Sequence, residues 1–379
     1  MTFLVVGNHT QGLSVIRSLG VEGINGHVLY DKEICLSRFS RYTSSFTRTK
    51  RHAISDAFLT ENHEPILSSM LSIVPDGEKW VLFGVNEDVI EMFYEHQDVL
   101  REKFLFPETA IENIVDKYKF ATMAERVGVC SPATYLLTEA TEKMQRGCSY
   151  VAKGRQGNKF RSLGNLKGKI IDNPEDIQPI RDYVQGRLDE SEVIIQEIIK
   201  PGPDAHVRSF AGFAIEGKPY AEFQYEKVRQ SPDQFGTGTY CKSIWVDELA
   251  GLGRKIINEL GYTGIYEIEF LRNSDGVYEV IEMNPRTWKS VGLAVASNRN
   301  LPYYYYQYLR DGSLPSSDHL EKYLADKLWA HVVTDLAFML KNRRLDFGYK
   351  DMVFCDYDKD DIKPFLAEIF LAPLIAAKI

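Results

Sequence analysis

Two acidic segments, YEIEF and EVIEMNPR, flank the turn sequence NSDG, and Asp-Gly is a strong signal for a β-hairpin. Strand alternation places Glu267 and Glu269 on the same face of the first segment. The hairpin then brings Glu269 beside Glu282, with Asn284 two residues further along that face. The spacing therefore predicts a cluster of two carboxylates and one carboxamide.

Such a cluster offers oxygen ligands only, which suits Mg²⁺ that also binds phosphate oxygens. Arg286 follows with the same strand parity and offers a rigid donor fork for a phosphoryl or carboxylate group. The alternative is an exposed hairpin with ordinary acidic residues. Glutamates among Ile, Phe and Met favour the cation site, because a buried carboxylate needs a partner of opposite charge.

Two lysines lie where phosphate groups are commonly bound. Lys117 is at the predicted start of a helix, and Lys153 ends a predicted strand (YVAK). The segment after Lys153, GRQGNKFRSLG, combines glycines with Lys159 and Arg161, so we expect a loop that closes over phosphates. Taken singly, each lysine is also compatible with an ordinary solvated surface position.

Two further segments suit binding. The strand that contains Gln196, Glu197 and Ile198 stops at Pro-Gly and is expected to present backbone groups to an adenine edge, with Asp204 accepting from ribose hydroxyls. The basic run 38–52 contains no acid, and we predict that Arg41 binds an anionic substrate. A solvated loop is the alternative for that run.

Composition limits the class of protein. A net charge of −8 argues against nucleic-acid binding, and the five scattered cysteines form no C-x-x-C pair. No apolar run is long enough for a membrane span, and the apolar segment 365–379 is predicted to be a packing or oligomer helix. The Asp-rich run 356–361 lacks the glycine and glutamate of a calcium loop. We therefore expect a cytoplasmic protein.

The elements that must position these residues fall into four regions. Short apolar runs alternate with amphipathic stretches over residues 1–112, which predicts a doubly wound α/β domain. Residues 113–190 and 191–300 are predicted as two subdomains with largely antiparallel sheets, since hairpin turns join their strands. Residues 301–379 are predicted to be mostly helical, and the tyrosine-rich stripe 303–308 is expected to pack against neighbouring domains.

The order of these motifs resembles the ATP-grasp superfamily. The resemblance covers about residues 1–300, and the segment SRFSRY and the block FPETAIENIVDKYKFATMAERVGVCSPATY are similar to the carboxylate–amine ligases of that superfamily, which include D-aspartate ligase-like and carbamoyl-phosphate-synthase-like proteins. It implies an N-terminal α/β domain followed by a two-subdomain ATP-grasp fold. One departure is Gly154, where relatives often have proline.

The resemblance also implies what individual residues bind. Lys117 and Lys153 would bind ATP phosphates, Lys227 and Arg229 the triphosphate, and Arg286 the transferring phosphoryl group. The adenine would be bound by Gln196, Glu197 and the Ile198 backbone, the ribose by Asp204, and two Mg²⁺ ions by Glu269, Glu282 and Asn284. Of these, Arg286, Lys153 and Arg229 are predicted as catalytic. Arg286 is also predicted, with Arg41, to contact the substrate. Mn²⁺ is an alternative to Mg²⁺.

The implied activity is ATP-dependent joining of a small carboxylate, such as an amino acid, to an amine through an acyl phosphate. An ATP-grasp enzyme with bicarbonate or a hydroxyl group as acceptor is the first alternative, and a non-catalytic nucleotide-binding protein is the second. We expect small-molecule substrates and a homodimer, with no nucleic-acid partner.

Overall fold

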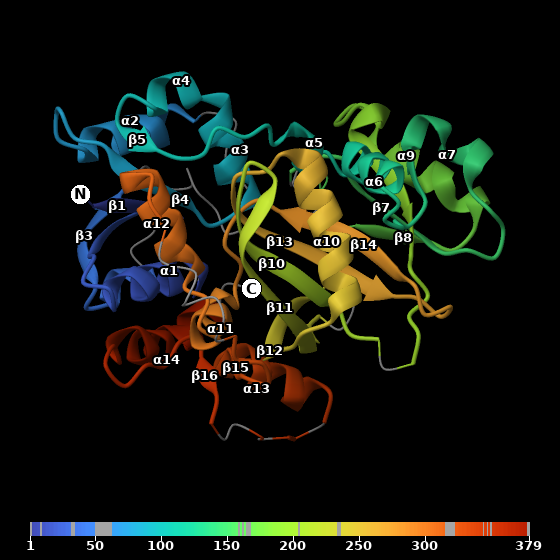
Figure 1. Cartoon of the computed structure of the whole chain (residues 1–379). Coiled ribbons are helices and arrows are strands. Elements are labelled where there is room, and N and C mark those ends of the chain that lie inside the picture. The colour runs from blue at the N-terminus through green and yellow to red at the C-terminus, as the bar shows by residue number, and fades with distance from the viewer. Residues whose placement is uncertain are drawn as a thin grey trace.

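The structure is a computed structural model, and it describes most of the chain (Figure 1). The described residues are 2–7, 10–31, 35–49, 63–157, 160, 163, 168–203, 205–232, 236–314, 323–343, 345, 346, 348 and 351–376. Asp204 and the loop residues Lys159 and Arg161 lie outside this part of the chain.

A parallel sheet forms the N-terminal part of the molecule. Its strand order is β3-β2-β1-β4-β5, and all of its pairs are parallel. This is the doubly wound arrangement that the alternating apolar runs predict. The strands are β1 Phe3–Val6, β2 Gly26–Tyr30, β3 Thr43–Arg48, β4 Trp80–Gly84 and β5 Phe104–Leu105, and the helices are α1 Thr10–Gly20, α2 Glu64–Ile73, α3 Glu87–Glu95 and α4 Gln97–Leu100, with a 3₁₀ turn at Leu36–Phe39.

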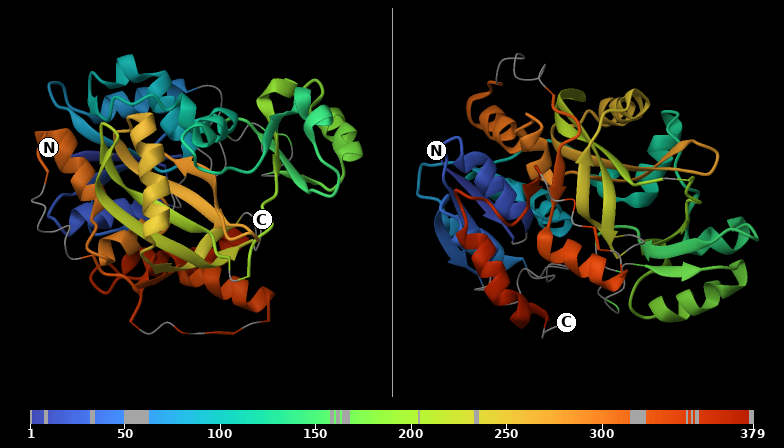
Figure 2. Two further views of the ribbon diagram at one scale, coloured as in Figure 1. Left: turned by 45° about the vertical axis from the view of Figure 1, so that its right-hand side comes forward. Right: turned by 90° about the horizontal axis from the view of Figure 1, so that it is seen from below.

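A small antiparallel sheet with order β6-β9-β7-β8 forms a separate lobe. Its strands are β6 Thr134–Leu136, β7 Tyr150–Gly154, β8 Lys169–Ile171 and β9 Val193–Glu197, and helices α7 Leu137–Lys143 and α9 Gln178–Val184 belong to the same lobe. Figures 1 and 2 show this lobe beside the central sheet, on the side away from the N-terminal domain.

The central sheet has seven strands in the order β14-β13-β10-β11-β12-β15-β16. All neighbours are antiparallel except β15 and β16. The largely antiparallel character predicted from the hairpin turns is therefore confirmed. The strands are β10 Arg208–Ile215, β11 Lys218–Ser231, β12 Thr237–Ser243, β13 Gly264–Arg272, β14 Tyr278–Asn284, β15 Leu328–Ala330 and β16 Val353–Phe354.

Helices cover this sheet and connect it to the other parts, and they are α5 Glu112–Val115, α6 Lys117–Arg126, α10 Asp247–Leu260, α11 Val291–Ala296, α12 Leu301–Asp311, α13 Val332–Lys341 and α14 Lys363–Ala376. Helix α10 lies across the sheet (Figure 1). Gly253 of α10 is so close to the Phe210 ring that an added Cβ would lie 2.1 Å from it. Glycine is thus required there for the helix to approach the sheet.

The tyrosines of α12 join the central sheet to the N-terminal domain. The Tyr305 ring centroid lies 4.9 Å from that of Phe83 and 6.3 Å from that of Phe213, and its hydroxyl donates to the Leu82 carbonyl at 3.0 Å. Tyr305 thereby contacts β4 on one side and β10 on the other. The interpretation of the tyrosine stripe as an interdomain packing surface agrees with this placement.

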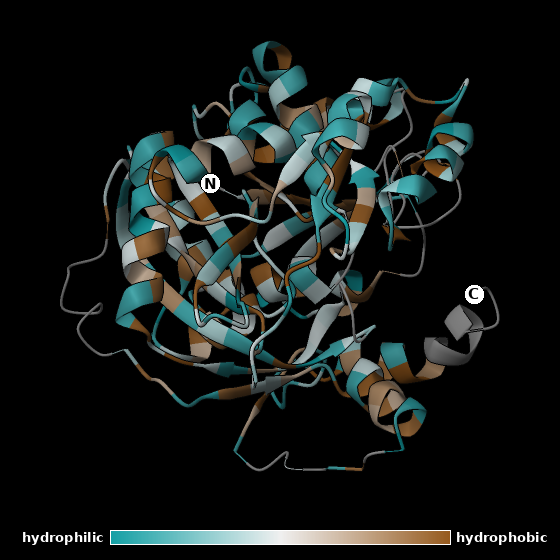
Figure 3. Ribbon diagram, turned by 90° about the vertical axis from the view of Figure 1, so that its right-hand side faces the viewer, coloured by the Kyte–Doolittle hydropathy of each residue, from teal (hydrophilic) through white to brown (hydrophobic). Residues whose placement is uncertain are grey.

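The sheets divide the chain at points that differ from the predicted regions. Strand β9 follows the predicted boundary at residue 190, yet it pairs within the small sheet. Strands β15 and β16 come from the C-terminal region and extend the central sheet. In the described residues no helix combines the length and the apolar character needed to cross a membrane. Figure 3 shows both hydrophilic and hydrophobic residues along most helices.

Candidate active site

A cavity of about 1100 Å³ collects residues from the small sheet, the central sheet and the start of α6. Its lining includes eleven of the predicted site residues, which are Lys117, Lys153, Gln196, Glu197, Ile198, Lys227, Arg229, Glu269, Glu282, Asn284 and Arg286. These residues span 170 positions of the sequence, so the fold brings residues of separate motifs together around one cavity. Arg41 is not among the lining residues.

The β13–β14 hairpin places its acidic residues in direct register. Glu269 pairs with Glu282 and Glu267 pairs with Asn284 across the two strands. The sequence predicts the meeting of Glu269 and Glu282, but the register reaches it through a bulge at Ile281, between the pairs Phe270–Val280 and Glu269–Glu282. The neighbouring strand β11 contributes Lys227, whose Nζ donates to Glu269 Oε1 at 2.7 Å. Two carboxylates and a buried ammonium group therefore share one face of the sheet.

Glu267 lies on the same face, two residues before Glu269 on β13, and fixes Asn284. The Asn284 Nδ2 donates to Glu267 Oε2 at 3.1 Å, and the Tyr225 hydroxyl makes a short hydrogen bond to the same carboxyl group. Burial and the nearby Glu269 raise the pKa of Glu267. Because its amide nitrogen is held in this way, Asn284 presents its Oδ1 to Arg286, which donates to it at 2.8 Å.

The start of α6 is anchored to the end of β7. Asp116 caps α6 by accepting from the amides of Tyr118 and Lys119, and its buried carboxylate also binds the Arg155 guanidinium at 2.8 Å. The Lys117 amide donates to the Arg155 carbonyl at 2.9 Å. These contacts hold Lys117 and Lys153 on neighbouring segments and direct both lysines to the cavity.

The lysines and Glu282 influence each other's protonation. Burial lowers the pKa of Lys153 to about 8, although Glu282 opposes the shift. Burial would also raise the pKa of Glu282, but Lys153, Lys117 and Lys227 together lower it. For Lys117, the carboxylates of Glu87 and Glu282 outweigh burial and raise the pKa. Glu282 is therefore an anion surrounded by cations.

Arg229 lines the cavity, but its guanidinium is bound by the C-terminal region. Its Nε and Nη2 donate to the two oxygens of Asp335 at 2.9 and 2.6 Å. Asp335 is fully buried and also accepts from Thr239 at 2.8 Å. Arg229 thus ties β11 to α13, a contact that the sequence does not reveal.

The predicted adenine segment is the end of β9. Gln196 Nε2 donates to Thr134 Oγ1 at 3.0 Å, so its side chain bridges to β6. The amides of Glu197 and Ile198 donate to the carbonyls of Ala133 and Ser149, both at 2.8 Å. The backbone is therefore fixed where it borders the cavity.

Arg41 contacts the C-terminal region instead of the cavity. Its amide donates to Asp361 Oδ1 at 2.8 Å and its Nη1 to the Asp360 carbonyl at 3.1 Å. Arg17 and Ser40 bind the other oxygen of Asp361, at 2.9 and 2.7 Å. In this structure the predicted substrate residue therefore helps attach the segment 355–361 to the N-terminal domain.

The cavity also includes residues for which sequence reasoning gave no role. Glu87, at the start of α3, lies 3.4 Å from Lys117 Nζ, and Lys289 is half-buried with its Nζ 3.2 Å from Thr334 Oγ1. Glu87 lies in the first turn of α3, and no local signal in the sequence links it to Lys117. Lys289 follows Arg286 by three residues, and its proximity to the segment EMNPR is the one signal available.

The donors at the hairpin fit a hard divalent cation. Glu269 and Glu282 supply carboxylate oxygens and Asn284 supplies a carboxamide oxygen, which is the ligand chemistry of Mg²⁺. The ammonium group of Lys227 lies at Glu269 in this structure and shows that this position already stabilises positive charge. A phosphate-bound cation would share these carboxylates with Lys227.

Comparison with solved structures identifies the fold. No protein-family model and no curated protein matches the sequence. The chain is similar in structure to N5-carboxyaminoimidazole synthetase from Staphylococcus aureus, with a TM-score of 0.64 and 15% identity over 90% of this chain and 86% of that one. It is also similar to biotin carboxylase from Campylobacter jejuni, with a TM-score of 0.63 and 15% identity over 86% of this chain and 74% of that one. A third similar structure is L-amino acid ligase from Bacillus licheniformis, with a TM-score of 0.61 and 14% identity over 86% of this chain and 78% of that one.

These neighbours are ATP-grasp proteins, and the likeness covers most of the chain. The ATP-grasp fold that the sequence motifs predict is therefore confirmed. At this level of identity the neighbours define the fold, and what the chain does must be argued from its own site.

Proposed function

We propose that the protein is an ATP-dependent ligase that activates a small carboxylate as an acyl phosphate and joins it to an amine. The observation that carries the proposal is the pairing of Glu269 with Glu282 in a cavity that also contains Lys117, Lys153 and Lys227. Alternating carboxylates and ammonium groups suit a metal–triphosphate, because the carboxylates bind the cation and the lysines bind phosphate oxygens.

The residues on each side of the cavity would bind a different part of the nucleotide. Lys117 and Lys153 would contact the phosphates, and the end of β9 at Glu197 and Ile198 would border the adenine. Bound Mg²⁺, held by Glu269, Glu282 and Asn284, would neutralise charge on the phosphates. A complex of an N5-carboxyaminoimidazole synthetase with ADP shows that a protein of this fold binds the nucleotide.

In the first chemical step, a carboxylate oxygen of the substrate forms a bond to the γ-phosphorus while the bond from that phosphorus to the β–γ bridging oxygen breaks, and ADP leaves. Arg286 lies beside Asn284 and would stabilise the charge on the transferring group. In the second step the amine nitrogen attacks the acyl carbon, inorganic phosphate leaves and the nitrogen loses a proton. Alignment and charge stabilisation suffice for both steps, so no covalent enzyme nucleophile is required.

Trapping of the acyl phosphate tests the proposal. The protein would be incubated with ATP, Mg²⁺, hydroxylamine and a panel of amino acids and other small acids, without any amine substrate. The correct acid should give a hydroxamate together with equal amounts of ADP and phosphate, because hydroxylamine replaces the amine in the second step. Replacement of hydroxylamine by amines then identifies the second substrate through amide formation.

The rival activities give different products in the same assay. A kinase that acts on a hydroxyl group gives ADP with a stable phosphate ester and no hydroxamate. Bicarbonate-dependent ADP release without any organic acid indicates carboxylation. Either result would contradict the carboxylate–amine proposal while leaving ATP use intact, and absence of ADP with every acceptor would contradict catalysis altogether.

A further inference from the structure

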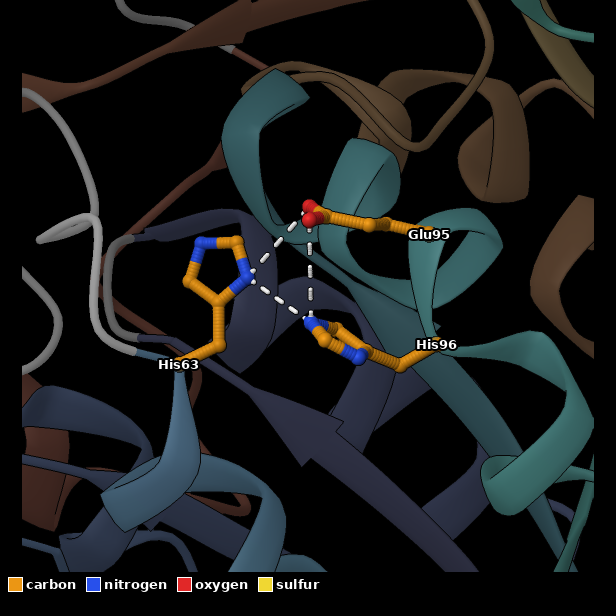
Figure 4. A group of neighbouring side chains, drawn as sticks. All are labelled: His63, Glu95 and His96. Carbon is orange, nitrogen blue, oxygen red and sulfur yellow. Dashed lines mark hydrogen bonds and ion pairs between the residues drawn. The ribbon is translucent and has the colours of Figure 1, made fainter.

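Three side chains converge at a corner of the N-terminal domain, away from the cavity. His63 lies directly before α2, Glu95 is the last residue of α3, and His96 joins α3 to α4. Figure 4 shows the two rings and the carboxylate pointing toward one another. We propose that His63, Glu95 and His96 form a binding site for a divalent transition metal of the Zn²⁺ type.

The separations of the candidate ligand atoms support this proposal. His63 Nδ1 lies 3.1 Å from His96 Nε2 and 3.4 Å from Glu95 Oε2, and His96 Nε2 lies 4.0 Å from Glu95 Oε1. Tetrahedral Zn²⁺ with bonds of about 2.0–2.1 Å places its ligand atoms about 3.3–3.4 Å apart. The observed separations lie on both sides of that value, so an ion at the centre needs only small side-chain adjustments.

The chemistry of the three groups is that of a transition-metal site. Two imidazole nitrogens and one carboxylate are typical ligands of Zn²⁺, whereas Mg²⁺ prefers oxygen. A neutral imidazole is the form that binds metal. The two ring nitrogens share a hydrogen bond, and a central cation would replace the shared proton.

The backbone at both histidines is already fixed by helix ends. The His63 carbonyl accepts from the amides of Ile66 and Leu67 at 3.0 Å, and the His96 carbonyl accepts from the Leu100 amide at 3.0 Å. Their side chains are 17% and 31% exposed, and that of Glu95 is 62% exposed, so an ion can enter from solvent. The bound ion would connect the start of α2 to the junction of α3 and α4.

A second group of similar composition, His331, Asp356 and Glu368, is buried in the C-terminal region. There His331 Nε2 lies 2.8 Å from Glu368 Oε1, and Thr334 lies 3.0 Å from His331 Nδ1. The two ring nitrogens of His331 are thus already engaged by protein groups. This group serves as an internal comparison, because any Zn²⁺ bound there must be distinguished from the proposed site.

The experiment measures Zn²⁺ affinity directly. The full-length protein is freed of metal with a chelator, and Zn²⁺ is titrated in competition with a chromophoric chelator in the wild type and in His96→Ala, Glu95→Gln and Asp98→Asn. We expect one tight site in the wild type, at least about tenfold weaker binding in His96→Ala and Glu95→Gln, and unchanged binding in Asp98→Asn. Asp98→Asn is the matched control, since it removes an exposed carboxylate two residues from His96.

Further variants separate this site from the other candidate positions. Glu282→Gln removes a carboxylate of the cavity and Glu368→Gln alters the C-terminal group, and both should keep the tight Zn²⁺ site. Zn²⁺ should also raise the Tm of the wild type by a few degrees but not that of His96→Ala. Equal affinity in the wild type, His96→Ala and Glu95→Gln would overturn the proposal. The absence of tight Zn²⁺ binding in the wild type would also overturn it. So would loss of tight Zn²⁺ binding in either of the single variants Glu282→Gln and Glu368→Gln.

Discussion

At the scale of single residues, the candidate site depends on charges that are buried but mutually compensated. Three lysines lower the pKa of Glu282, and Lys227 Nζ lies 2.7 Å from Glu269 Oε1. A buried charge is tolerated when a partner of opposite sign lies nearby. The same property gives the site its proposed chemistry, because a metal–triphosphate brings both signs of charge into one place.

Glu282→Gln removes one of these charges and should lower kcat by about two orders of magnitude or more, because a ligand of the proposed metal is lost. The fold should be retained, since glutamine has nearly the same shape. Steady-state ADP release at saturating Mg²⁺ measures the effect. Glu279→Gln, on the same strand but outside the cavity lining, is the matched control and should retain activity. Equal activity of both variants would contradict the role of Glu282.

The lowered pKa of Lys153, at about 8, gives a pH prediction. Below this pH the side chain is charged and would bind the phosphate as proposed, whereas above it the neutral amine would lose the charge-assisted interaction. The affinity of the free protein for ATP should therefore fall as the pH rises through about 8. Calorimetric titrations with ATP from pH 6.5 to 9.5 measure this dependence.

Two substitutions separate the effect of Lys153 from that of other groups. Lys153→Arg keeps the charge over the whole range, so its affinity should not fall near pH 8. Lys153→Met should weaken ATP binding about 10- to 100-fold at pH 7, as expected for loss of a charged hydrogen bond worth about 1.5–3 kcal/mol. A wild-type decrease near pH 8 that persists in Lys153→Arg would assign the titration to another residue.

At the scale of elements, the site depends on pairs of segments that are distant in sequence. Asp116 and Arg155 attach α6 to the end of β7, and Arg229 and Asp335 attach β11 to α13. The first pair positions Lys117 and Lys153, which both line the cavity. The second holds the C-terminal region against the sheet that carries the hairpin site.

Asp335→Ala should destabilise the protein by about 3–5 kcal/mol, because it leaves the mostly buried Arg229 without its bidentate partner. Asp346→Ala is the matched control. Asp346 contacts the same guanidinium at 3.4 Å, but its side chain is 67% exposed, so the expected cost is about 0–1 kcal/mol. Urea unfolding followed by circular dichroism measures both free energies. Equal destabilisation would show that burial does not decide the strength of these pairs.

At the scale of the whole molecule, the small lobe lies beside the central sheet (Figure 2), and residues of both sheets line the cavity. Helix α12 and its tyrosines attach the N-terminal domain to the central sheet. Glu87 reaches the cavity from that domain and contacts Lys117. Cytoplasmic location and a homodimer stay predictions.

Tyr305→Ala should weaken the attachment of the N-terminal domain. Loss of a buried aromatic ring costs about 3–5 kcal/mol, and this ring contacts both Phe83 and Phe213. Tyr305→Phe keeps the ring and should cost about 1–3 kcal/mol, since only the hydrogen bond to the Leu82 carbonyl is lost. Urea unfolding and limited proteolysis measure the effect. A smaller loss in Tyr305→Ala than in Tyr305→Phe would contradict the packing role.

The sequence by itself determined the features that depend on local pairing. The NSDG turn was enough to predict the hairpin, and strand alternation to place Glu267 and Glu269 on one face, because a hairpin closes a short loop. The register set by the turn alone would place Glu269 opposite Ile281, and only the bulge at Ile281 brings Glu269 opposite Glu282. The alternating apolar runs of residues 1–112 likewise determined the parallel N-terminal sheet.

Tertiary structure alone decided the contacts between distant segments. Asp335 meets Arg229 across 106 positions, and Arg41 contacts Asp361 across 320. The short strands β15 and β16 find their partners only in the assembled central sheet. Such pairs leave no periodic pattern in the sequence, since packing of complete elements selects them. Sequence could therefore predict the hairpin and its acidic residues, whereas the charges that surround it and the distant contacts that hold it depend on the assembled fold.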